Sequence, residues 1–586
     1  MDTERRIMEL AESTLRLEKN EGEDKVISLR EAIKRNVKTG MVLHITSSAA
    51  LSEILRPYWG TKPEFTLIAP PLPLGWNIVH AGLAKKIIFC NTGRSDVFNR
   101  AYREKKVNFE VWSFAGISQR LLAGALGTGF IPTKSLIGTT MAEENKDSFQ
   151  VIGDPFGCGE KVGIIKALNP DLTILHGWAA DSDGNTILPA GPTPYGSAVD
   201  DWSALASKND VVVTVEKLVS TAFIREHSSM VRIPGYRVNS VSVVPFGAHP
   251  GCMHGCGNIK EFEAYDEDSE FLTKYQEAAK NPQSLDAWIK QWVLDCPSHE
   301  DYLRKLGNDR IQTLKRKGRG NILKYPLPFM IEKVSPSIEF SETEMMIVAA
   351  SRKIKERIFK GGHKVVLCGM GIADLATWLP YYQLKAEGHP VNLMSGIGLY
   401  GFAPWPRDPS LAILPNLQTC KIISNVAWAY NLILTGENRR SISILGAFQV
   451  DKFGNLNSGR ISNELFGEGP GGAGDAFQSC ETVAIIGQSK ARFVERAPYI
   501  TVPGANVKTL VSTLGIFEKL GDDEEFSLTA CLPNSNFPTM NEKIENVKTH
   551  CSWELKVAPK IEEIFPPTFE ELMTLRLIDP NGLFRN

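Results

Sequence analysis

The chain has 586 residues, of which 43% are hydrophobic and 23% are charged, and its formal net charge is −2. This length exceeds what one hydrophobic core organises, so we expect at least two domains. The near-neutral charge gives no basic footprint for nucleic acid or an anionic membrane. The sequence has neither a spanning apolar run nor a secretory signal near its start. We therefore expect a cytoplasmic globular protein that binds neither nucleic acid nor membrane.

Ten cysteines are scattered along the chain, and the nearest pair, Cys252 and Cys256, flanks His254. A zinc site needs further ligands at comparable spacing, and the surrounding sequence offers none. We therefore expect reduced thiols and no bound metal.

Short β-rich runs alternate with helical patterns, which is typical of α/β proteins with mostly parallel sheets. Buried strands are predicted at 169–178, 210–218, 364–371, 439–449 and 482–488. The pattern predicts a first domain over residues 1–320 with a charged helical extension at about 258–317, a linker over 321–340, and a second domain over 341–586. Ser341, followed three residues later by Glu344, is a capping-box signal for a helix start.

An internal repeat relates the two halves. The segments ILHGWAADSDGNT (174–186) and ILGAFQVDKFGNL (444–456) share Ile-Leu, then an Asp and a Gly-Asn at the same spacing. Downstream, each half reaches a Pro-Gly, at 234–235 and at 503–504. Nearly constant spacing of several features indicates two related α/β domains fused in one chain.

Several motifs, in this order along the chain, resemble the class I CoA-transferases, nearest the glutaconate CoA-transferase type with both subunits fused. The first half carries GALGTGFIPTKSLIGTT (124–140), DPFGCGEK (154–161) and FGAHP (246–250). The second half carries LGAFQVDKFGNLNSG (445–459), GPGGAGDA (469–476) and RFVERAPYITVPG (492–504). The resemblance implies two facing α/β domains, an acyl-CoA substrate between them and a homodimer. Coenzyme A would enter as part of the substrate, with no permanently bound cofactor.

In that family, a glutamate in a Glu-x-Gly-x-x-Gly turn attacks the acyl-CoA carbonyl and forms a glutamyl-CoA thioester. The matching turn here is NLMSGIGLYGFAPWP (392–406), and the position of the nucleophile is Gly396. The neighbouring Met394 and Ser395 are not carboxylates either. The resemblance therefore implies that the turn keeps its backbone frame but lacks the nucleophile.

Backbone N–H groups in glycine-rich turns can stabilise an oxyanion. By the resemblance we expect substrate contacts from two glycine-rich segments and from one small residue after the first strand. The residues expected to contact substrate are Gly396, Gly398, Leu399, Gly401, Gly471, Gly472, Ala473 and Ser47.

Without the glutamate, the chemistry needs another group, and Glu110 in VNFEVWSFAG is our first candidate base. Its apolar neighbours would desolvate the carboxylate and raise its pKa, which suits acid–base work. A surface acid at a strand end is the alternative. His249 lies in a glycine-rich loop and His44 on an early strand, and either could assist as a proton carrier.

Other polar residues fit structural roles better. His176 lies within a strand and is expected to be a core histidine with satisfied hydrogen bonds. Asp181 and Asp451 recur in both repeats, and because chemistry needs one site, symmetry favours turn formation for both. Glu464 and Glu468, just before the second glycine-rich loop, are candidates for a relocated nucleophile.

The missing glutamate favours hydrolysis or C–C cleavage of a β-keto or cyclic acyl-CoA, as in offshoots of the resembled family that open rings or decarboxylate. A decarboxylase is disfavoured because residues 392–406 contain no cysteine; Cys368 lies on the preceding strand and is expected to be packed. CoA transfer with a relocated nucleophile is the first alternative. A non-catalytic acyl-CoA binding protein is the second.

Overall fold

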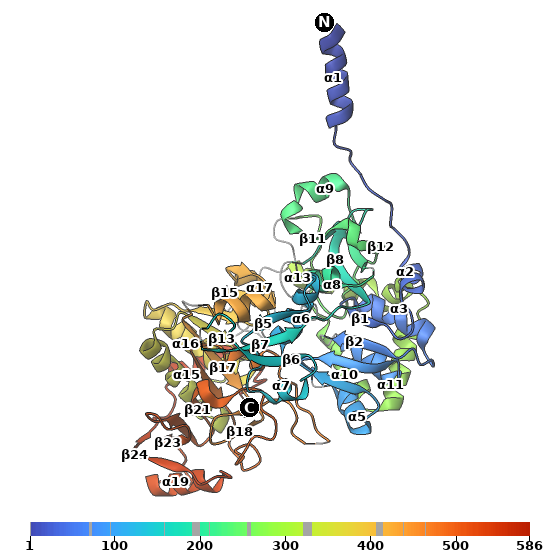
Figure 1. Ribbon diagram of the computed structural model, residues 1–586. Coiled ribbons are helices and arrows are strands. Elements are labelled where there is room, and N and C mark those ends of the chain that lie inside the picture. The colour runs from blue at the N-terminus through green and yellow to red at the C-terminus, as the bar shows by residue number, and fades with distance from the viewer. Residues whose placement is uncertain are drawn as a thin grey trace.

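The computed structural model describes residues 2–69, 73–93, 95–157, 159–189, 200–209, 211–254, 259–319, 331–405, 414–436, 439–462 and 464–585 (Figure 1). Two large β-sheets, one in each half of the sequence, form two lobes that lie side by side. The chain is therefore mixed α/β, as the alternation of strand and helix patterns predicts.

The first sheet is built around parallel strands with buried, β-branched sequences. In sheet order these strands are β4 (Asn108–Val111), β3 (Ala84–Phe89), β2 (Phe65–Ala69), β1 (Val42–Ile45), β8 (Leu172–Ala180), β10 (Val211–Leu218) and β12 (Val238–Val243). The short strands β9 (Thr186–Ile187) and β11 (Val231–Ile233) add antiparallel pairs beside β8. The predicted strands at 169–178 and 210–218 correspond to β8 and β10.

Helices follow the strands of the first half and extend beyond it. They include α2 (Leu29–Asn36), α3 (Ser48–Tyr58), α4 (Trp76–His80), α5 (Asp96–Glu104), α6 (Phe114–Ala125), α7 (Thr140–Glu144), α8 (Asp200–Ala206) and α9 (Thr221–Glu226). The predicted helical extension is present as α10 (Ser269–Ala279), α11 (Pro282–Ile289), α12 (His299–Leu306) and α13 (Asn308–Arg319). A separate three-stranded sheet consists of β5 (Phe130–Thr133), β7 (Lys161–Lys166) and β6 (Phe149–Gly153).

The second sheet repeats the central part of the first. Its parallel strands are β14 (Asn392–Ser395), β13 (Val365–Cys368), β17 (Ser441–Gly446), β20 (Glu481–Ile485) and β21 (Val507–Val511). One side continues into β15 (Leu399–Phe402) and β16 (Ile422–Ile423), and the other into β22 (Gly515–Lys519), β23 (Phe526–Cys531) and β24 (Lys556–Glu563). Its helices include α15 (Glu342–Gly361), α16 (Ile372–Ala386), α17 (Leu414–Thr419), α18 (Ala473–Ala476), α19 (Met540–Thr549) and α20 (Phe569–Ile578).

The capping box predicted at Ser341 is confirmed. The Ser341 side chain accepts from the Glu344 N–H, and the Glu344 carboxylate accepts from the Ser341 N–H, at the start of α15. The division into domains and a linker stays a prediction, and residues 321–330 of that linker lie outside the described part of the chain.

The sequence repeat is a repeat of structure. In each half the aspartate carboxylate closes its own turn by accepting from the N–H of Asn185 or Asn455, at 2.8 and 3.0 Å. The same asparagine then accepts from the glycine of the downstream Pro-Gly, Gly235 or Gly504, at 2.9 and 2.8 Å. Asp181 and Asp451 are fully buried turn-formers, as symmetry predicts.

A lysine fastens each repeated turn, although the two lysines come from unrelated places in the sequence. Lys25 donates to the carbonyls of Asp183 and Gly235, at 2.8 and 3.0 Å. Lys519, on β22, donates to the carbonyls of Phe453 and Gly504, at 2.8 and 2.7 Å. Equivalent carbonyls in the two halves therefore accept from a lysine, and a different part of the chain supplies that lysine in each half.

Buried residues of each half pack into core clusters of the other half. Phe466 of the second half contacts Phe89 and Phe98 of the first, with ring centroids 5.7 and 5.4 Å apart. Conversely, Ala115 of the first half is fully buried within a core cluster of the second. In contrast, α1 (Asp2–Leu15) projects from the body and has no buried residue (Figure 1). None of the helices in the described ranges has the length and apolar character to cross a membrane.

We predict that Asn185→Ala and Asn455→Ala destabilise the protein to a similar extent, by about 1–3 kcal/mol each, because each removes the acceptor of the Gly235 or Gly504 N–H and the side-chain amide that donates to the buried aspartate. Thermal unfolding measures the effect. Asn541→Ala, at an exposed position of α19, is the control and should change stability by less than about 0.5 kcal/mol. A loss confined to one of the two repeats would contradict the structural equivalence.

Candidate functional site

The second glycine-rich segment, GPGGAGDA, lies against the ends of strands in the first half. The Gly471 N–H donates to the carbonyl of Cys90, just after β3, at 2.8 Å. The Gly471 carbonyl accepts from the N–H of Phe114, at the start of α6, also at 2.8 Å. Gly469 packs so tightly on the Cys90 carbonyl that a Cβ there would lie 2.7 Å from it. The segment is therefore a junction between the halves, at the carboxyl ends of parallel strands, where α/β proteins place their ligands.

The catalytic-type turn of the second half approaches the same junction. It is a tight hairpin turn between β14 and β15, closed by a hydrogen bond of 3.0 Å from the Gly398 N–H to the Ser395 carbonyl. Gly398 has φ +102°, and a Cβ there would lie 2.3 Å from the Ser424 carbonyl. This position requires glycine both for its torsion and for the close approach of another backbone.

Tyr430 brings the two glycine segments together. It lies on a π-helical turn (Trp428–Ile433), and 7% of its surface is exposed. A Cβ built on Gly396 would lie 1.8 Å from the Tyr430 hydroxyl oxygen, and one built on Gly472 would lie 1.7 Å from it. The phenol therefore fills the space in which a side chain at position 396, where the resemblance predicts a nucleophile, would begin.

Asp475 joins this arrangement from the short helix α18. Its Oδ1 accepts from the Ser113 hydroxyl at 2.7 Å, and its Oδ2 accepts from the Ala115 N–H at 2.9 Å. Because the carboxylate faces the N-terminus of α6, the helix dipole favours its negative charge. Burial nevertheless dominates and raises the pKa of Asp475 to about 7, against the lowering effect of these hydrogen bonds.

Cys90, Tyr430 and Asp475, which we call the junction triad, are mutually coupled. Burial and then the nearby Asp475 raise the pKa of the Cys90 thiol. Burial, followed by Asp475 and Cys90, likewise raises the pKa of the Tyr430 phenol. At neutral pH the thiol and the phenol are therefore protonated, so Cys90 is not a thiolate nucleophile.

The predicted raised pKa of Glu110 is wrong. Glu110 lies on the edge strand β4, where it pairs with Lys86 and with Arg120 (2.7 Å) and accepts from the Trp112 indole at 2.6 Å. Burial alone would raise the pKa, but the hydrogen bond from Lys86 and the charge of Arg120 outweigh it and lower the pKa. Glu110 is thus an ionised partner of two cations, and the geometry gives no support for a general base.

His249 lies away from the junction. Its Nδ1 lies 2.5 Å from the Tyr302 hydroxyl and its Nε2 lies 3.0 Å from Asp268, which also pairs with Arg310. Burial lowers the pKa of His249, although Asp268 opposes the shift. The fully buried imidazole fastens the helical extension to the first half, which does not match the predicted assisting role.

His44 and Ser47 belong to the interior of the first sheet. His44 is fully buried in the middle of β1, between β2 and β8. Ser47 caps α3 and accepts from the Thr214 hydroxyl at 2.9 Å, and Thr214 in turn contacts His176. His176 also reaches Glu216 at 2.9 Å, which confirms it as a core histidine with partners on both ring nitrogens.

The expected backbone donors are mostly engaged within the protein. The N–H groups of Gly471, Gly398 and Ala473 donate to Cys90, Ser395 and Pro470 respectively. Leu399 is fully buried in the core of the second half, and Gly401 has φ +70° in β15, where a Cβ would meet Lys421. The expectation that Gly398 and Gly471 present N–H donors to a substrate is therefore wrong, because tertiary hydrogen bonds already use them.

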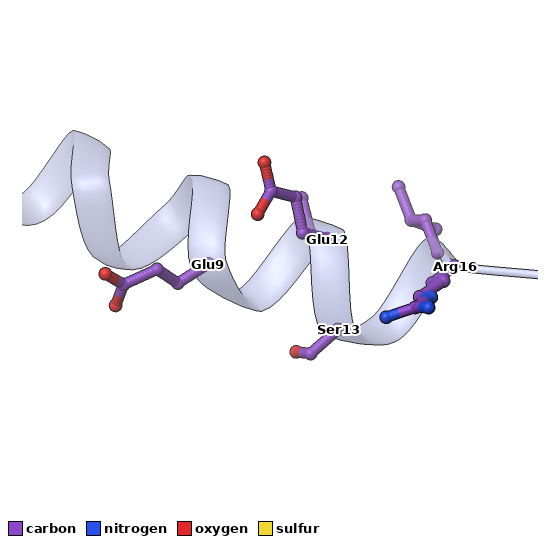
Figure 2. Close-up of a pocket in the computed structure, with 6 residues that line it drawn as sticks. Glu9, Glu12, Ser13 and Arg16 are labelled. Carbon is purple, nitrogen blue, oxygen red and sulfur yellow. The ribbon is translucent and has the colours of Figure 1, made fainter.

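Two surface hollows lie elsewhere. Figure 2 shows one beside α1, lined by side chains of that helix and of Arg16. Since a single exposed helix forms its wall, it cannot enclose a substrate. The other lies near the amino ends of β2 and β3, lined in part by Lys62, Lys85 and Arg100, which is the wrong end of the sheet for an α/β ligand site.

Among the described residues, no group of three or more His, Cys, Asp or Glu side chains is arranged to hold a metal ion. The Cys252 thiol lies 2.8 Å from Nε2 of His254. The second cysteine of that sequence pair, Cys256, lies outside the described residues. Cys368 is buried on β13 and packed, as predicted.

Residues 26–243 match the family model described as Coenzyme A transferase. The chain is similar to coenzyme A transferases over these residues. It is 28% identical over 319 residues to one subunit of the glutaconate CoA-transferase of Acidaminococcus fermentans, covering 50% of this chain and 94% of that protein. It is 27% identical over 260 residues to one subunit of the 3-oxoadipate CoA-transferase of Pseudomonas knackmussii, covering 41% of this chain and 94% of that protein.

Two further matches, one to a solved structure and one to a related sequence, extend these similarities. An acyl-CoA transferase (YdiF) from Escherichia coli O157:H7 superposes with a TM-score of 0.63 at 14% identity, covering 94% of this chain and 97% of that one. This match shows that both halves share the fold of class I CoA-transferases. The chain is also 27% identical over 191 residues to the cholesterol ring-cleaving hydrolase IpdA subunit of Rhodococcus jostii, covering 31% of this chain and 58% of that protein.

Sequence reasoning missed the junction triad. Cys90, Tyr430 and Asp475 come from three separated segments, and none of them belongs to a recognisable catalytic motif. The one sequence signal for this triad is the motif GPGGAGDA, in which Asp475 follows the glycines. The junction itself, in which Asp475 of one half accepts from the first turn of the other half's helix α6, is visible only in three dimensions.

We predict that stability depends on pH through Asp475. Its folded pKa of about 7 exceeds the ordinary 3.8, so protonation stabilises the folded state fully below about pH 4, and that contribution is lost as pH rises through about 7. Since one pKa unit is worth about 1.4 kcal/mol, the wild type should gain a few kcal/mol over Asp475→Asn between pH 8 and pH 5. Melting temperatures across this range test it. Asp522→Asn, at an exposed turn, should show no such trend; parallel curves for Asp475→Asn and the wild type would contradict the assignment.

We predict that Glu110→Gln lowers stability by about 1.5–3 kcal/mol, because it leaves the buried guanidinium of Arg120 without a counter-charge. The matched control is Glu104→Gln, which removes an exposed pair with Lys106 and should cost less than about 1 kcal/mol. Chemical denaturation of the three proteins measures both values. An unchanged denaturation midpoint for Glu110→Gln would show that the ion pairs do not stabilise the edge of the sheet.

Proposed function

We propose that the chain acts on acyl-CoA thioesters and cleaves them, by hydrolysis or by C–C bond (ring-opening) cleavage of a β-keto or cyclic acyl-CoA, without a glutamyl-CoA intermediate. The observation that carries the proposal is position 396. A glycine stands there, and Tyr430 occupies the adjoining space, so that position offers no carboxylate to attack a thioester. Catalysis by the family's covalent route needs that carboxylate.

Two further observations support the proposal. The backbone frame of the turn is kept, since Gly398 holds the hairpin at its positive φ and the turn lies at the junction of the halves. The similarity to a ring-cleaving hydrolase is consistent with a reaction of this class on this scaffold. In hydrolysis, water oxygen bonds to the thioester carbonyl carbon, the C–S bond breaks, and CoA leaves as the thiol with the proton that water gives up.

CoA transfer with a relocated nucleophile is the alternative, supported by the similarity to subunits of two transferases over nearly their whole lengths. Glu468 is the best placed acid for it: its carbonyl accepts from the Thr92 N–H at 2.8 Å, so it lies at the junction, whereas Glu464 is exposed. To act as the nucleophile, the Glu468 carboxylate would have to reach the substrate from the loop before GPGGAGDA, and not from the turn at 392–406.

A screen of acyl-CoA esters with and without acetate distinguishes these functions. We expect release of free CoA that does not require a carboxylate acceptor, and no adduct when the protein is treated with hydroxylamine or borohydride in the presence of substrate. Acceptor-dependent formation of acetyl-CoA, with an adduct mapped by mass spectrometry to a glutamate, would overturn the proposal in favour of transfer. Binding of acyl-CoA esters without turnover of any would instead indicate a non-catalytic binding protein.

A further inference from the structure

Tyr430 lies between Gly396 and Gly472, and neither of these glycines has the positive φ that favours glycine over other residues. Gly472 has φ −94°, and Gly396 is not among the glycines with positive φ. An alanine would therefore fit both positions on backbone grounds. What excludes it is space, since the hydroxyl oxygen of Tyr430 would lie 1.8 and 1.7 Å from the two Cβ atoms, well below any real contact.

The clash involves the ring as well as the hydroxyl. From the Cβ position at Gly396, the ring carbon that carries the hydroxyl lies at 2.2 Å and a neighbouring ring carbon at 2.6 Å. The ring is anchored, because Tyr430 is buried in a core cluster together with Met394, Val426 and Ala429. A side chain at 396 therefore cannot be accommodated by a small rotation of a flexible group.

We propose that Tyr430 determines the reaction class of this enzyme: it fills the volume that the side chain of a nucleophile at position 396 must pass through, and so holds the site to chemistry without a covalent glutamyl intermediate. The inference rests on the proposed function. According to this inference, Tyr430, which lies outside both glycine-rich segments, excludes the transferase route. Introducing a carboxylate at position 396 is therefore not sufficient for the transferase route while Tyr430 is present.

The exclusion has a chemical consequence. A carboxylate introduced by Gly396→Glu would attack the thioester carbonyl through one oxygen and displace CoA thiolate, giving a mixed anhydride. The thiolate would then attack the glutamyl carbonyl, releasing the acyl group as a free carboxylate and leaving a glutamyl-CoA thioester. This sequence needs the carboxylate to extend from position 396 into the site, which Tyr430 prevents and Tyr430→Ala permits.

The steric part is tested by stability, independently of any activity. Gly396→Ala should lower the melting temperature by roughly 3 °C or more in the wild-type background. It should do the same in Tyr430→Phe, whose ring atoms still clash, and should have little effect in Tyr430→Ala. Gly472→Ala should follow the same pattern, and Gly446→Ala, whose Cβ would lie 3.9 Å from its nearest neighbour, is the control. An equal cost in all three backgrounds, or none in the wild type, would overturn the inference.

The chemical part is tested by intact-protein mass spectrometry after incubation with an acyl-CoA that the wild type turns over. We expect a CoA adduct at position 396 in Gly396→Glu/Tyr430→Ala, and none in Gly396→Glu, Tyr430→Ala or Gly396→Glu/Tyr430→Phe. An adduct in Gly396→Glu alone, or its absence from the folded double variant, would overturn the inference. A wild-type adduct would refute the proposed function instead, and the melting temperatures would still decide whether Tyr430 blocks position 396.

Discussion

The backbone of Gly471 joins the two halves through hydrogen bonds in both directions. Gly471 donates to the Cys90 carbonyl and accepts from the Phe114 N–H, so the second half closes over the end of β3 and the start of α6. Asp475, four residues on, accepts from the Ala115 N–H of α6 and so adds to the helix's own cap, Ser113, whose hydroxyl accepts from the Gly116 N–H. Because a Cβ at position 469 would lie 2.7 Å from the Cys90 carbonyl oxygen, the close approach of the two halves requires glycine there.

This arrangement changes the meaning of the glycine-rich motifs. A glycine-rich loop in an enzyme is readily interpreted as a cradle for substrate, yet here Gly398 and Gly471 have their N–H groups engaged by the protein. What the two motifs share is Tyr430, which lies against Gly396 on one side and Gly472 on the other. The site is thus organised around an aromatic side chain, where the family's covalent chemistry would place a carboxylate.

Burial raises the pKa of a carboxylic acid and pairing with cations lowers it, and Asp475 and Glu110 show the two opposite outcomes. Glu110 is largely buried, but two cations and an indole N–H stabilise its charge, so its pKa falls. Asp475 is fully buried with only neutral hydrogen-bond donors, and its pKa rises to about 7. Apolar neighbours in the sequence predict burial well, but they do not reveal the counter-charges, which for Glu110 come from Lys86 on the adjacent strand and Arg120 on α6.

The sequence by itself determined the α/β class and the repeat with its Asp-x-x-Gly-Asn turns, because strand patterns and local spacing encode these features directly. It also carries the resemblance to CoA-transferases, from which the loss of a carboxylate at position 396 is predicted. The tertiary structure alone decided that His249 fastens a helical extension, that Ser47 caps a helix within the first half, and that Tyr430 fills the space beside Gly396. Each of these depends on contacts between segments far apart in the chain: position 430 approaches 396 and 472 only after both glycine turns have formed. The residue type at a position shows what chemistry is available there, whereas packing decides whether the space for that chemistry is open.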